Sequence, residues 1–343
     1  MGLTRREFVQ CGLMTGAMAF AADGQGQAMD TTSFQKHQED RRKELWSILG
    51  DLPERRAPKA VLRKREQHEG YTLEHLELDL NGIEMAPALL LIPDKVKTPA
   101  PGMLYIHWHG GDYAVGKQEL LHGTRVLEPY APVYAEKGIV ALAIDSWCFG
   151  ERMPYPDDGG RGESDTFKEM LWKGRVLWGM MLFDEWQALN YLCSRPEVDP
   201  SRIGAFGISM GSTKAWWLAA LDERIRCCID LCCLTDYEAL LETKALSGHG
   251  IYYYVPSLLK HFQTHEINEL IVPRAHLSLN GREDKLTPPQ GVARIRDHLM
   301  PLYAQYGRAE DCRIELFDCG HKELPEMRGL VLDWLDLYLL RGA

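Results

Sequence analysis

Gly207-Ile208-Ser209-Met210-Gly211 is a G-x-S-x-G sequence that joins two apolar segments. Residues 202–208 before it are typical of a buried strand, and residues 212–221 after it are rich in Ala, Leu and Trp, as expected of a helix. Strand, tight turn and helix are the context in which this motif holds a nucleophilic serine. The glycines are required because the turn is sharp and its neighbours need to lack side chains. We therefore predict that Ser209 is a nucleophile.

Two later segments supply a carboxylate and a histidine in the order that the motif requires. Residues 277–280 are a short apolar strand candidate, and Asp284 lies in the loop that follows it. Residues 313–317 alternate apolar and polar side chains, and His321 lies in the loop after them. The order Ser, Asp, His is typical of α/β sheets that carry G-x-S-x-G, and it differs from the orders in chymotrypsin and subtilisin.

These residue types form a complete set for nucleophilic catalysis. A serine hydroxyl is a weak nucleophile at neutral pH and needs a base to take its proton, a role that suits His321. A buried carboxylate holds the imidazole in the right tautomer and stabilises the cation that forms, and we expect Asp284 in this role. Two rival positions for the acid are Glu283 beside it and Asp236, after the Cys-rich strand candidate.

A glycine-rich loop upstream is a candidate oxyanion hole. The apolar segment 102–108 leads into His109-Gly110-Gly111-Asp112. Such a loop can aim a backbone N–H group at a developing oxyanion, and the second donor comes from the residue after the nucleophile, Met210. We expect Met210 and Gly111 to be the two donors, with Gly110 as the alternative to Gly111.

The same loop allows a metal interpretation. His107 and His109 lie two residues apart, so they share one face of a strand, and Asp112 follows closely. Further ligands at comparable strand ends are missing from the sequence pattern. We therefore expect no metal and no cofactor, with His107 as a hydrogen-bonded core residue and His109 as a brace for the oxyanion loop.

The composition is that of an ordinary globular protein: of 343 residues, 45% are hydrophobic and 26% are charged. The net charge is −10, which gives no reason to expect a nucleic-acid partner and mainly favours solubility. The length allows two domains or one α/β domain with insertions.

The N-terminus has the features of an export signal. Thr4–Gln10 contains a twin-arginine pair, and residues 9–22 form a modestly apolar stretch that is too short to span a bilayer comfortably. Ala19-Phe20-Ala21 and Gly26-Gln27-Ala28 are candidate cleavage sites. We expect residues 1–28 to be a twin-arginine signal peptide, which implies a bacterial protein that is periplasmic or secreted and has no stable membrane insertion.

The remaining chain predicts one sheet preceded by a helical arm. Residues 29–70 are charged and favour a helical arm, and residues 71–80 and 83–92 alternate around Asn81-Gly82, as in a β-hairpin. After the hairpin, strand candidates alternate with helix candidates, which predicts a mostly parallel, doubly wound sheet. We expect the catalytic domain to span residues 71–343, with helices over residues 122–137, 183–193 and 326–340.

Two segments exceed what a minimal sheet needs. Residues 151–174 are polar and glycine-rich, and residues 241–271 contain three consecutive tyrosines. Both should lie above the carboxyl ends of strands, where α/β sheets bind ligands. We interpret them as lid-like insertions that line the substrate pocket.

With these residues in place, the chain resembles the α/β-hydrolase superfamily, and within it the dienelactone-hydrolase-like and acetyl xylan esterase-like group. The resemblance covers residues 71–340 and rests on the Ser209 motif and on Ala143–Arg152, which is similar to that group's D-x-x-x-F-G-E-R segment. Asp199–Ile203 and Val272–Arg274 add to it. The resemblance implies an α/β-hydrolase fold, ester hydrolysis, often of acetylated carbohydrate, and no cofactor.

The chain departs from that group in two places. Dienelactone hydrolases use a cysteine nucleophile, so Ser209 argues against that activity. Many relatives have a further glycine after G-x-S-x-G, where this chain has Ser212; the exchange leaves the chemistry intact.

Substrate contacts are less sharply indicated. Aromatic faces suit sugar rings but also fill ordinary cores, and both interpretations stay open for Trp108, Trp147 and Tyr253. Arg152 either binds a substrate carboxylate or forms a structural ion pair with Asp145 or Glu151.

The sequence as a whole predicts a serine hydrolase that cleaves carboxylic esters of small molecules or carbohydrates through an acyl-enzyme. One alternative is a peptidase of the prolyl-oligopeptidase kind, although only a short segment precedes the sheet, leaving no room there for a gating domain. The other is a hydrolase-like binding protein without catalysis. The oligomeric state is not predicted.

Overall fold

The computed structural model describes residues 31–95 and 99–341. The predicted signal peptide, residues 1–28, lies outside the described residues. Of the described chain, residues up to His37 belong to one unit and residues from Gln38 to another. Every predicted site residue lies in the second unit.

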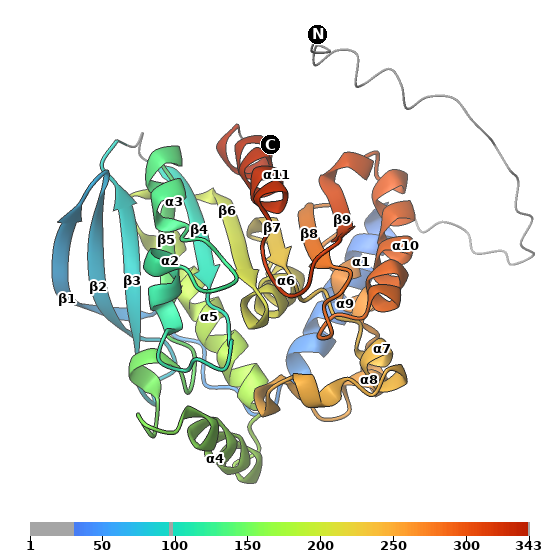
Figure 1. The fold of residues 1–343 in the computed structure, drawn as a ribbon, viewed down its shortest axis with the longest axis horizontal. Helices are drawn as coiled ribbons and strands as arrows, with labels where there is room; N and C mark the ends of the chain where they lie inside the picture. The colour runs from blue at the N-terminus through green and yellow to red at the C-terminus, as the bar shows by residue number, and fades with distance from the viewer. Residues whose placement is uncertain (1–30, 96–98, 342–343) are drawn as a thin grey trace, which may run out of the picture. The chain divides into compact units, whose positions relative to one another are not determined.

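One sheet forms the centre of this unit (Figure 1). Within the described residues it has nine strands in the order β1-β2-β3-β5-β4-β6-β7-β8-β9. The neighbours from β1 to β5 pair antiparallel, and all later neighbours pair parallel. The strands are β1 (Lys59–His68), β2 (Tyr71–Asp79), β3 (Met85–Pro93), β4 (Ala100–Ile106), β5 (Val140–Ile144), β6 (Val198–Ile208), β7 (Ile225–Leu231), β8 (Ala275–Gly281) and β9 (Cys312–Phe317).

Helices follow most of the parallel strands, as crossover connections require. They are α1 (Thr31–Ser47), α2 (Glu119–His122), α3 (Ala131–Lys137), α4 (Gly159–Trp172), α5 (Leu177–Ser194), α6 (Met210–Leu221), α7 (Tyr237–Glu242), α8 (Leu258–His261), α9 (Thr264–Glu269), α10 (Pro289–Gln305) and α11 (Pro325–Leu335). Single turns are η1 (Gly116–Gln118), η2 (Gly150–Arg152), η3 (Leu246–Gly248), η4 (Ile251–Tyr253), η5 (Ala309–Asp311) and the π-helical η6 (Asp336–Leu340).

The central strands are buried on both faces, which explains their continuous apolar sequences. Successive side chains of a strand point to opposite faces, and the set that includes Leu89, Tyr105 and Phe206 forms one core cluster with residues of α3 and α11. Helices α5 and α6 pack on the other face (Figure 1). The predicted mostly parallel sheet with an antiparallel N-terminal hairpin is confirmed.

The predicted helical arm over residues 29–70 differs from the structure in its second half. The helix ends at Ser47, and residues 59–68 form β1, which pairs with β2 along its length. Its side chains are almost all exposed. A charged strand is a common way to protect the open edge of a sheet. The charged residues that favoured a helix in the sequence are therefore the exposed side chains of an edge strand.

The predicted helix over residues 122–137 is also shorter than expected. Gly123 adopts a positive φ of 63° after α2, and α3 begins only at Ala131. Proline is tolerated in the first turn of a helix and not in its interior. Pro132 therefore limits where the helix can start, and Gly138 in the left-handed conformation ends it as expected.

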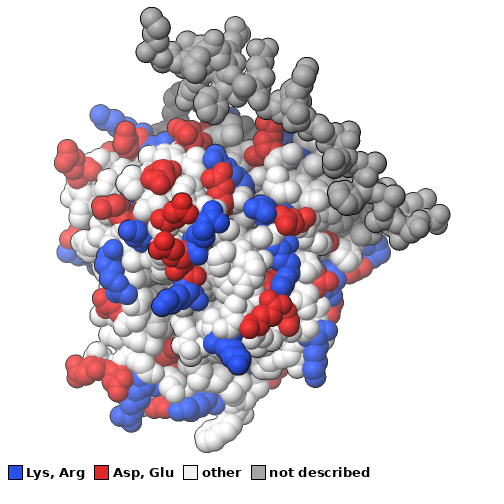
Figure 2. Space-filling view, turned by 45° about the vertical axis from the view of Figure 1, so that its right-hand side comes forward, with Lys and Arg blue, Asp and Glu red and all other residues white. Residues whose placement is uncertain are grey.

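Surface charges of both signs are interspersed on the face drawn in Figure 2. Many are paired; Arg294, for example, lies within 3.0 Å of a carboxylate oxygen of Asp236 and of Glu242. Among the described residues, no helix combines the length and the apolar character needed to cross a bilayer.

Candidate active site

Ser209 occupies the sharp turn between β6 and α6. It is the residue that precedes the helix, with φ 60° and ψ −121°. A non-glycine residue rarely adopts a positive φ, and such strain persists only where the surroundings enforce it. The Ser209 N–H donates to the carbonyl of Leu231 at 2.9 Å, which fixes the turn against the end of β7. The side chain is 7% exposed.

The two glycines of the motif leave no room for a side chain. A Cβ atom on Gly207 would lie 2.4 Å from the carbonyl carbon of Gly211. A Cβ atom on Gly211 would lie 2.0 Å from the carbonyl oxygen of Ile106, the last residue of β4. Helix α6 therefore begins in direct backbone contact with β4, and this contact requires glycine.

Asp284 and His321 form the acid–base pair that the sequence predicts. The Asp284 Oδ2 atom lies 2.7 Å from Nδ1 of His321, and its Oδ1 accepts a hydrogen bond from the Leu286 N–H at 2.9 Å. Asp284 is 4% exposed. With a proton on Nδ1 shared with the carboxylate, Nε2 of His321 is left to accept another.

The two rival acids have other surroundings. Glu283 is exposed. Asp236 precedes α7, where its carboxylate accepts from the Ala239 N–H at 2.8 Å and pairs with Arg294. Asp236 is thus used as a helix cap, and Asp284 is the acid that contacts His321.

The three predicted catalytic residues lie at one edge of the sheet. Ser209 follows β6, Asp284 follows β8 and His321 follows β9, and these strands run parallel with only β7 between the first two. The carboxyl ends of parallel strands are where ligands bind in open α/β sheets.

The predicted oxyanion loop follows β4 at the same edge. Gly110 and Gly111 both have positive φ, 57° and 73°. The Gly111 N–H donates to Nδ1 of His109 at 3.0 Å, so it is already engaged. The structure gives the Gly110 N–H no hydrogen-bond partner among the described residues. Met210 is the first residue of α6, where N–H groups have no partner within the helix.

The ring nitrogens of both loop histidines are occupied by protein partners. His107 is fully buried; its Nδ1 lies 2.7 Å from the Trp108 carbonyl, and its Nε2 accepts from the Ser146 N–H at 3.1 Å. His109 lies between the Gly111 N–H and the carboxylate of Glu163, 3.1 Å from its Nε2. These contacts match the expected core and bracing roles.

Two groups of described residues bring possible metal ligands together. Their ligand atoms lie within 4.8 Å of one another, and the groups are Cys228, Asp230 and His276, and Cys232, Asp284 and His321. In the first, Asp230 binds both Ser278 and His276 at 2.7 Å. The second contains the acid–base pair, and its thiol donates to the Lys322 carbonyl at 3.5 Å. Hydrogen bonding accounts for both arrangements.

A buried polar chain that sequence reasoning missed supports the predicted oxyanion loop. Lys214 on α6 is fully buried, lies 3.0 Å from Glu185 and donates to the Ser146 hydroxyl. Ser146 in turn donates its N–H to His107, which contacts the Trp108 carbonyl. The single lysine within an Ala/Leu/Trp-rich helix is the signal that could have revealed this chain, since buried charges are paired.

Glu119 holds the same loop from the other side. The Trp108 N–H donates to Glu119 Oε2 at 3.1 Å, and the Tyr105 hydroxyl donates to its Oε1 at 2.9 Å. Burial raises the pKa of Glu119 to about 8. Its carboxyl group is therefore largely protonated at neutral pH, which removes the cost of burying a charge there.

The predicted substrate contacts fall in different places. Trp108 is buried beside the predicted oxyanion loop, with the guanidinium of Arg125 4.8 Å from its ring. Trp147 and Arg152 line a separate cavity. Arg152 is buried and pairs with Glu84 and Asp184, at 2.6 and 2.9 Å. This is a structural ion pair, although its partners differ from those expected.

The insertion of residues 241–271 reaches the acid–base pair through His249. Nε2 of His249 lies 3.0 Å from the carbonyl of Leu286, in the loop that carries Asp284. Its ring stacks on Tyr253, with 4.4 Å between centroids. Burial lowers the pKa of His249 to about 4, and the nearby Asp284 and His321 act on it as well. Sequence reasoning included this segment as a lid without singling out the histidine.

Comparison with known proteins identifies the family to which this chain belongs. The model of the Abhydrolase family matches residues 14–287. A protein of Bacillus subtilis (strain 168) that carries the name "Putative hydrolase YtaP" is 45% identical over 304 residues, which cover 88% of this chain and 99% of the relative.

Solved structures with lower identity share the fold. A glucuronoyl esterase from Solibacter usitatus has a TM-score of 0.65 at 16% identity, and the match covers 90% of this chain and 93% of the esterase chain. An acetyl xylan esterase from Paenibacillus sp. R4 has a TM-score of 0.52 at 19% identity, covering 91% and 96%. The predicted α/β-hydrolase fold is confirmed.

The contact between Gly211 and Ile106 predicts a strong effect of one added methyl group. We expect Gly211→Ala to lose about 3 kcal/mol of unfolding free energy, because the clash is with backbone that cannot rotate away. Gly329→Ala is the matched control; a Cβ atom there meets nothing within 4 Å, so we expect a gain of about 0.5–1 kcal/mol. Urea denaturation measures both, and equal stability of the two variants would contradict the prediction.

The lowered pKa of His249 predicts a contribution to acid sensitivity. In the unfolded chain its pKa is near the ordinary value of about 6.5, so below that pH the unfolded state binds a proton that the folded state does not. Stability is then lost as the pH falls from about 6.5 towards about 4. His249→Gln keeps an N–H donor for the Leu286 carbonyl, and we expect a smaller difference in unfolding free energy between about pH 7 and about pH 5.

The control for this measurement is His122→Gln, a change of the same kind at an exposed histidine. It should retain the pH dependence of the wild type. A His249→Gln variant with the full wild-type pH dependence would show that His249 is already protonated in the folded protein or does not change its protonation on unfolding.

Proposed function

Since the chain belongs to the Abhydrolase family, we propose that it is a serine hydrolase that cleaves carboxylic esters through Ser209, His321 and Asp284. The observation that carries the proposal is the 2.7 Å contact between Asp284 and Nδ1 of His321, at the sheet edge where Ser209 is held at positive φ. Strain at the serine of a sharp strand-to-helix turn is typical of a functional site.

In the first half of the reaction, the Ser209 hydroxyl attacks the ester carbonyl carbon. Nε2 of His321 takes the hydroxyl proton, and Asp284 stabilises the imidazolium that forms. The tetrahedral intermediate collapses, the bond from the carbonyl carbon to the alcohol oxygen breaks, and His321 returns the proton to the leaving alcohol. The acyl group remains on the Ser209 oxygen.

In the second half, a water molecule replaces the alcohol. His321 takes a proton from the water, the hydroxide adds to the acyl carbon, and the intermediate releases the carboxylic acid. The proton then returns to the Ser209 oxygen, so the enzyme is regenerated without any further reactant. Within the residues described, nothing in this sequence of steps calls for a metal or a cofactor.

The oxyanion that forms in both halves needs donors that are not already engaged. We assign one to the Met210 N–H at the start of α6, where helix geometry leaves it unpaired. For the second, the hydrogen bond from Gly111 to His109 favours Gly110 over Gly111. The positive φ of both glycines is compatible with either assignment.

Carbohydrate esters are the substrate class that we favour. Two structural relatives are named as a glucuronoyl esterase and an acetyl xylan esterase, and this likeness supports the proposal. We further propose that the twin-arginine N-terminus exports the protein to the periplasm or beyond it, where such polymers are met.

The proposal predicts that ester hydrolysis depends on Ser209 and does not depend on a metal. We expect Ser209→Ala to lower the rate of p-nitrophenyl acetate hydrolysis by at least about 1,000-fold, in buffer with EDTA. Ser47→Ala, a matched change at an exposed serine whose hydroxyl donates to the Glu44 carbonyl, should keep the wild-type rate. Activity that survives in Ser209→Ala, or that EDTA abolishes, would contradict the proposal.

A further inference from the structure

A buried glutamate of the first insertion (residues 151–174), Glu163 on α4, contacts the predicted oxyanion loop. The residue is 3% exposed. Its Oε1 atom lies 3.1 Å from Nε2 of His109, and its Oε2 atom accepts a hydrogen bond from the Tyr113 hydroxyl at 3.3 Å. A glutamate is almost never fully buried unless it is paired. Both partners lie in the segment that follows β4, so the carboxylate ties α4 to that segment.

The two ring nitrogens of His109 have opposite hydrogen-bonding roles. The Gly111 N–H donates to Nδ1 at 3.0 Å, so Nδ1 carries no proton. In a neutral imidazole the proton is then on Nε2, from which it is donated to the Glu163 carboxylate. Because an ionised carboxylate only accepts hydrogen bonds, Glu163 favours this tautomer. In the other tautomer, an N–H group at Nδ1 would face the Gly111 N–H, and the contact inside the loop would be lost.

The His109 ring is also enclosed by neighbouring groups. Phe149 lies edge-on to it and Tyr252 stacks on it, with 5.0 and 5.2 Å between the ring centroids. A Cβ atom on Gly250 would lie 3.1 Å from Nε2. These contacts leave the ring little freedom to turn. Packing therefore sets the position of Nδ1, and Glu163 sets its protonation state.

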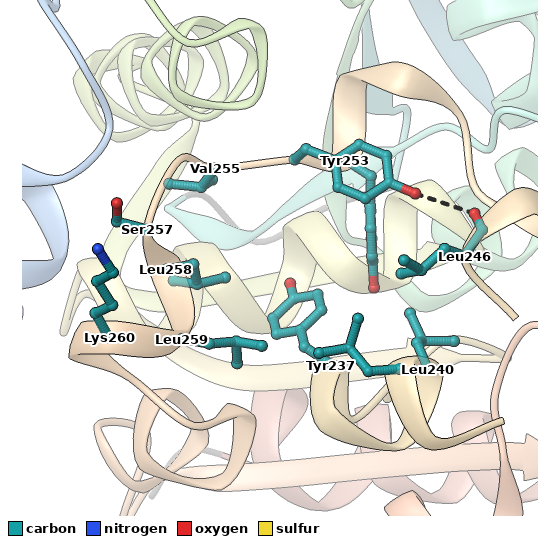
Figure 3. A pocket seen from close by; sticks show the side chains of 11 residues that line it. Tyr237, Leu240, Leu246, Tyr253, Val255, Ser257, Leu258, Leu259 and Lys260 are labelled. Atoms are coloured by element: carbon teal, nitrogen blue, oxygen red, sulfur yellow. Dashed lines mark hydrogen bonds between the residues drawn. The ribbon is translucent and has the colours of Figure 1, made fainter. Parts of the chain in front are cut away.

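Both insertions reach the predicted oxyanion loop at this histidine. Glu163 comes from α4 and Tyr252 comes from η4, and these two elements pack against each other. Tyr253, the next residue of η4, lines the apolar cavity inside the second insertion together with Tyr237 (Figure 3). Both tyrosines of η4 are buried, which anchors the surface on which the His109 ring stacks.

The loop that His109 braces depends on such contacts for its shape. Gly110 and Gly111 both have positive φ, and glycine is the residue with the most conformational freedom to lose on folding. An oxyanion hole is effective only when its donors are in place before the charge forms. The hydrogen bond from the Gly111 N–H to His109 is one fixed point of this loop.

We propose that Glu163 is a positioning residue for the reaction: it fixes the tautomer of His109 and, through it, the conformation of the predicted oxyanion loop. The inference rests on the proposed serine hydrolase function. Glu163 takes no part in the proton transfers of the reaction, which belong to His321. Without its carboxylate, the His109 proton can move to Nδ1, the Gly111 contact breaks, and the oxyanion donors lose their alignment.

Glu163→Met tests the inference, because methionine keeps the unbranched shape and removes the carboxylate. We expect kcat/KM for p-nitrophenyl acetate to fall by about 10- to 100-fold, as misplaced oxyanion donors would cause. Glu163→Gln keeps an amide oxygen as an acceptor and should lose less than about fivefold. Glu169→Met, the same change at an exposed glutamate of α4 that pairs with Lys173, should keep the wild-type value.

A double-mutant cycle tests whether Glu163 acts through His109. His109→Ala should lower kcat/KM at least as much as Glu163→Met does. The double variant should be no worse than His109→Ala alone, because the two residues act as one unit. If Glu163 only stabilised α4, the two losses would multiply.

NMR of the histidine ring nitrogens gives a second measurement, which involves no turnover. In the wild type, His109 should carry its proton on Nε2, and Glu163→Met should shift part of the population to the tautomer with the proton on Nδ1. The His109 signals are identified by their absence from the spectrum of His109→Ala.

Three results would each overturn the inference: wild-type kcat/KM in Glu163→Met, losses that multiply in the double variant, or a wild-type His109 that carries its proton on Nδ1. A failure of the proposed function would look different, since wild type and Ser209→Ala would then hydrolyse the ester at the same rate.

Discussion

The contact between the start of α6 and the end of β4 is the constraint on which the site depends. Gly211 lies so close to the Ile106 carbonyl that a Cβ atom would come within 2.0 Å of it. This approach forces the turn at Ser209 into positive φ, and it sets the loop after β4 next to the first free N–H groups of α6. One backbone contact thus brings the turn of the proposed nucleophile to the end of β4, where the candidate oxyanion loop begins.

Buried polar groups then hold that loop in place. The chain from Lys214 through Ser146 and His107 reaches the Trp108 carbonyl, while Glu119 binds the Trp108 N–H from the other side. A buried network of this kind is costly unless every member is satisfied. Its value lies in fixing the loop before substrate arrives, as electrostatic stabilisation of an oxyanion requires.

Much of this could be predicted from local sequence, and the failures have a common physical cause. The G-x-S-x-G turn, the hairpin at Asn81-Gly82 and the contact of Asp284 with His321 follow from short-range patterns and strand order. The edge strand Lys59–His68 could not, because its charged side chains are compatible with a helix until a partner strand is known. The partners of Arg152 and the role of His249 depend on side chains distant in sequence, which no local pattern specifies.

The central claim is that Ser209 is a nucleophile activated by His321, and covalent labelling tests it most directly. Treatment with a fluorophosphonate followed by peptide mass spectrometry should find one adduct, on Ser209, and labelling should be far slower in His321→Ala because the base is missing. An adduct on another residue, or labelling of Ser209 at the same rate without His321, would contradict the account.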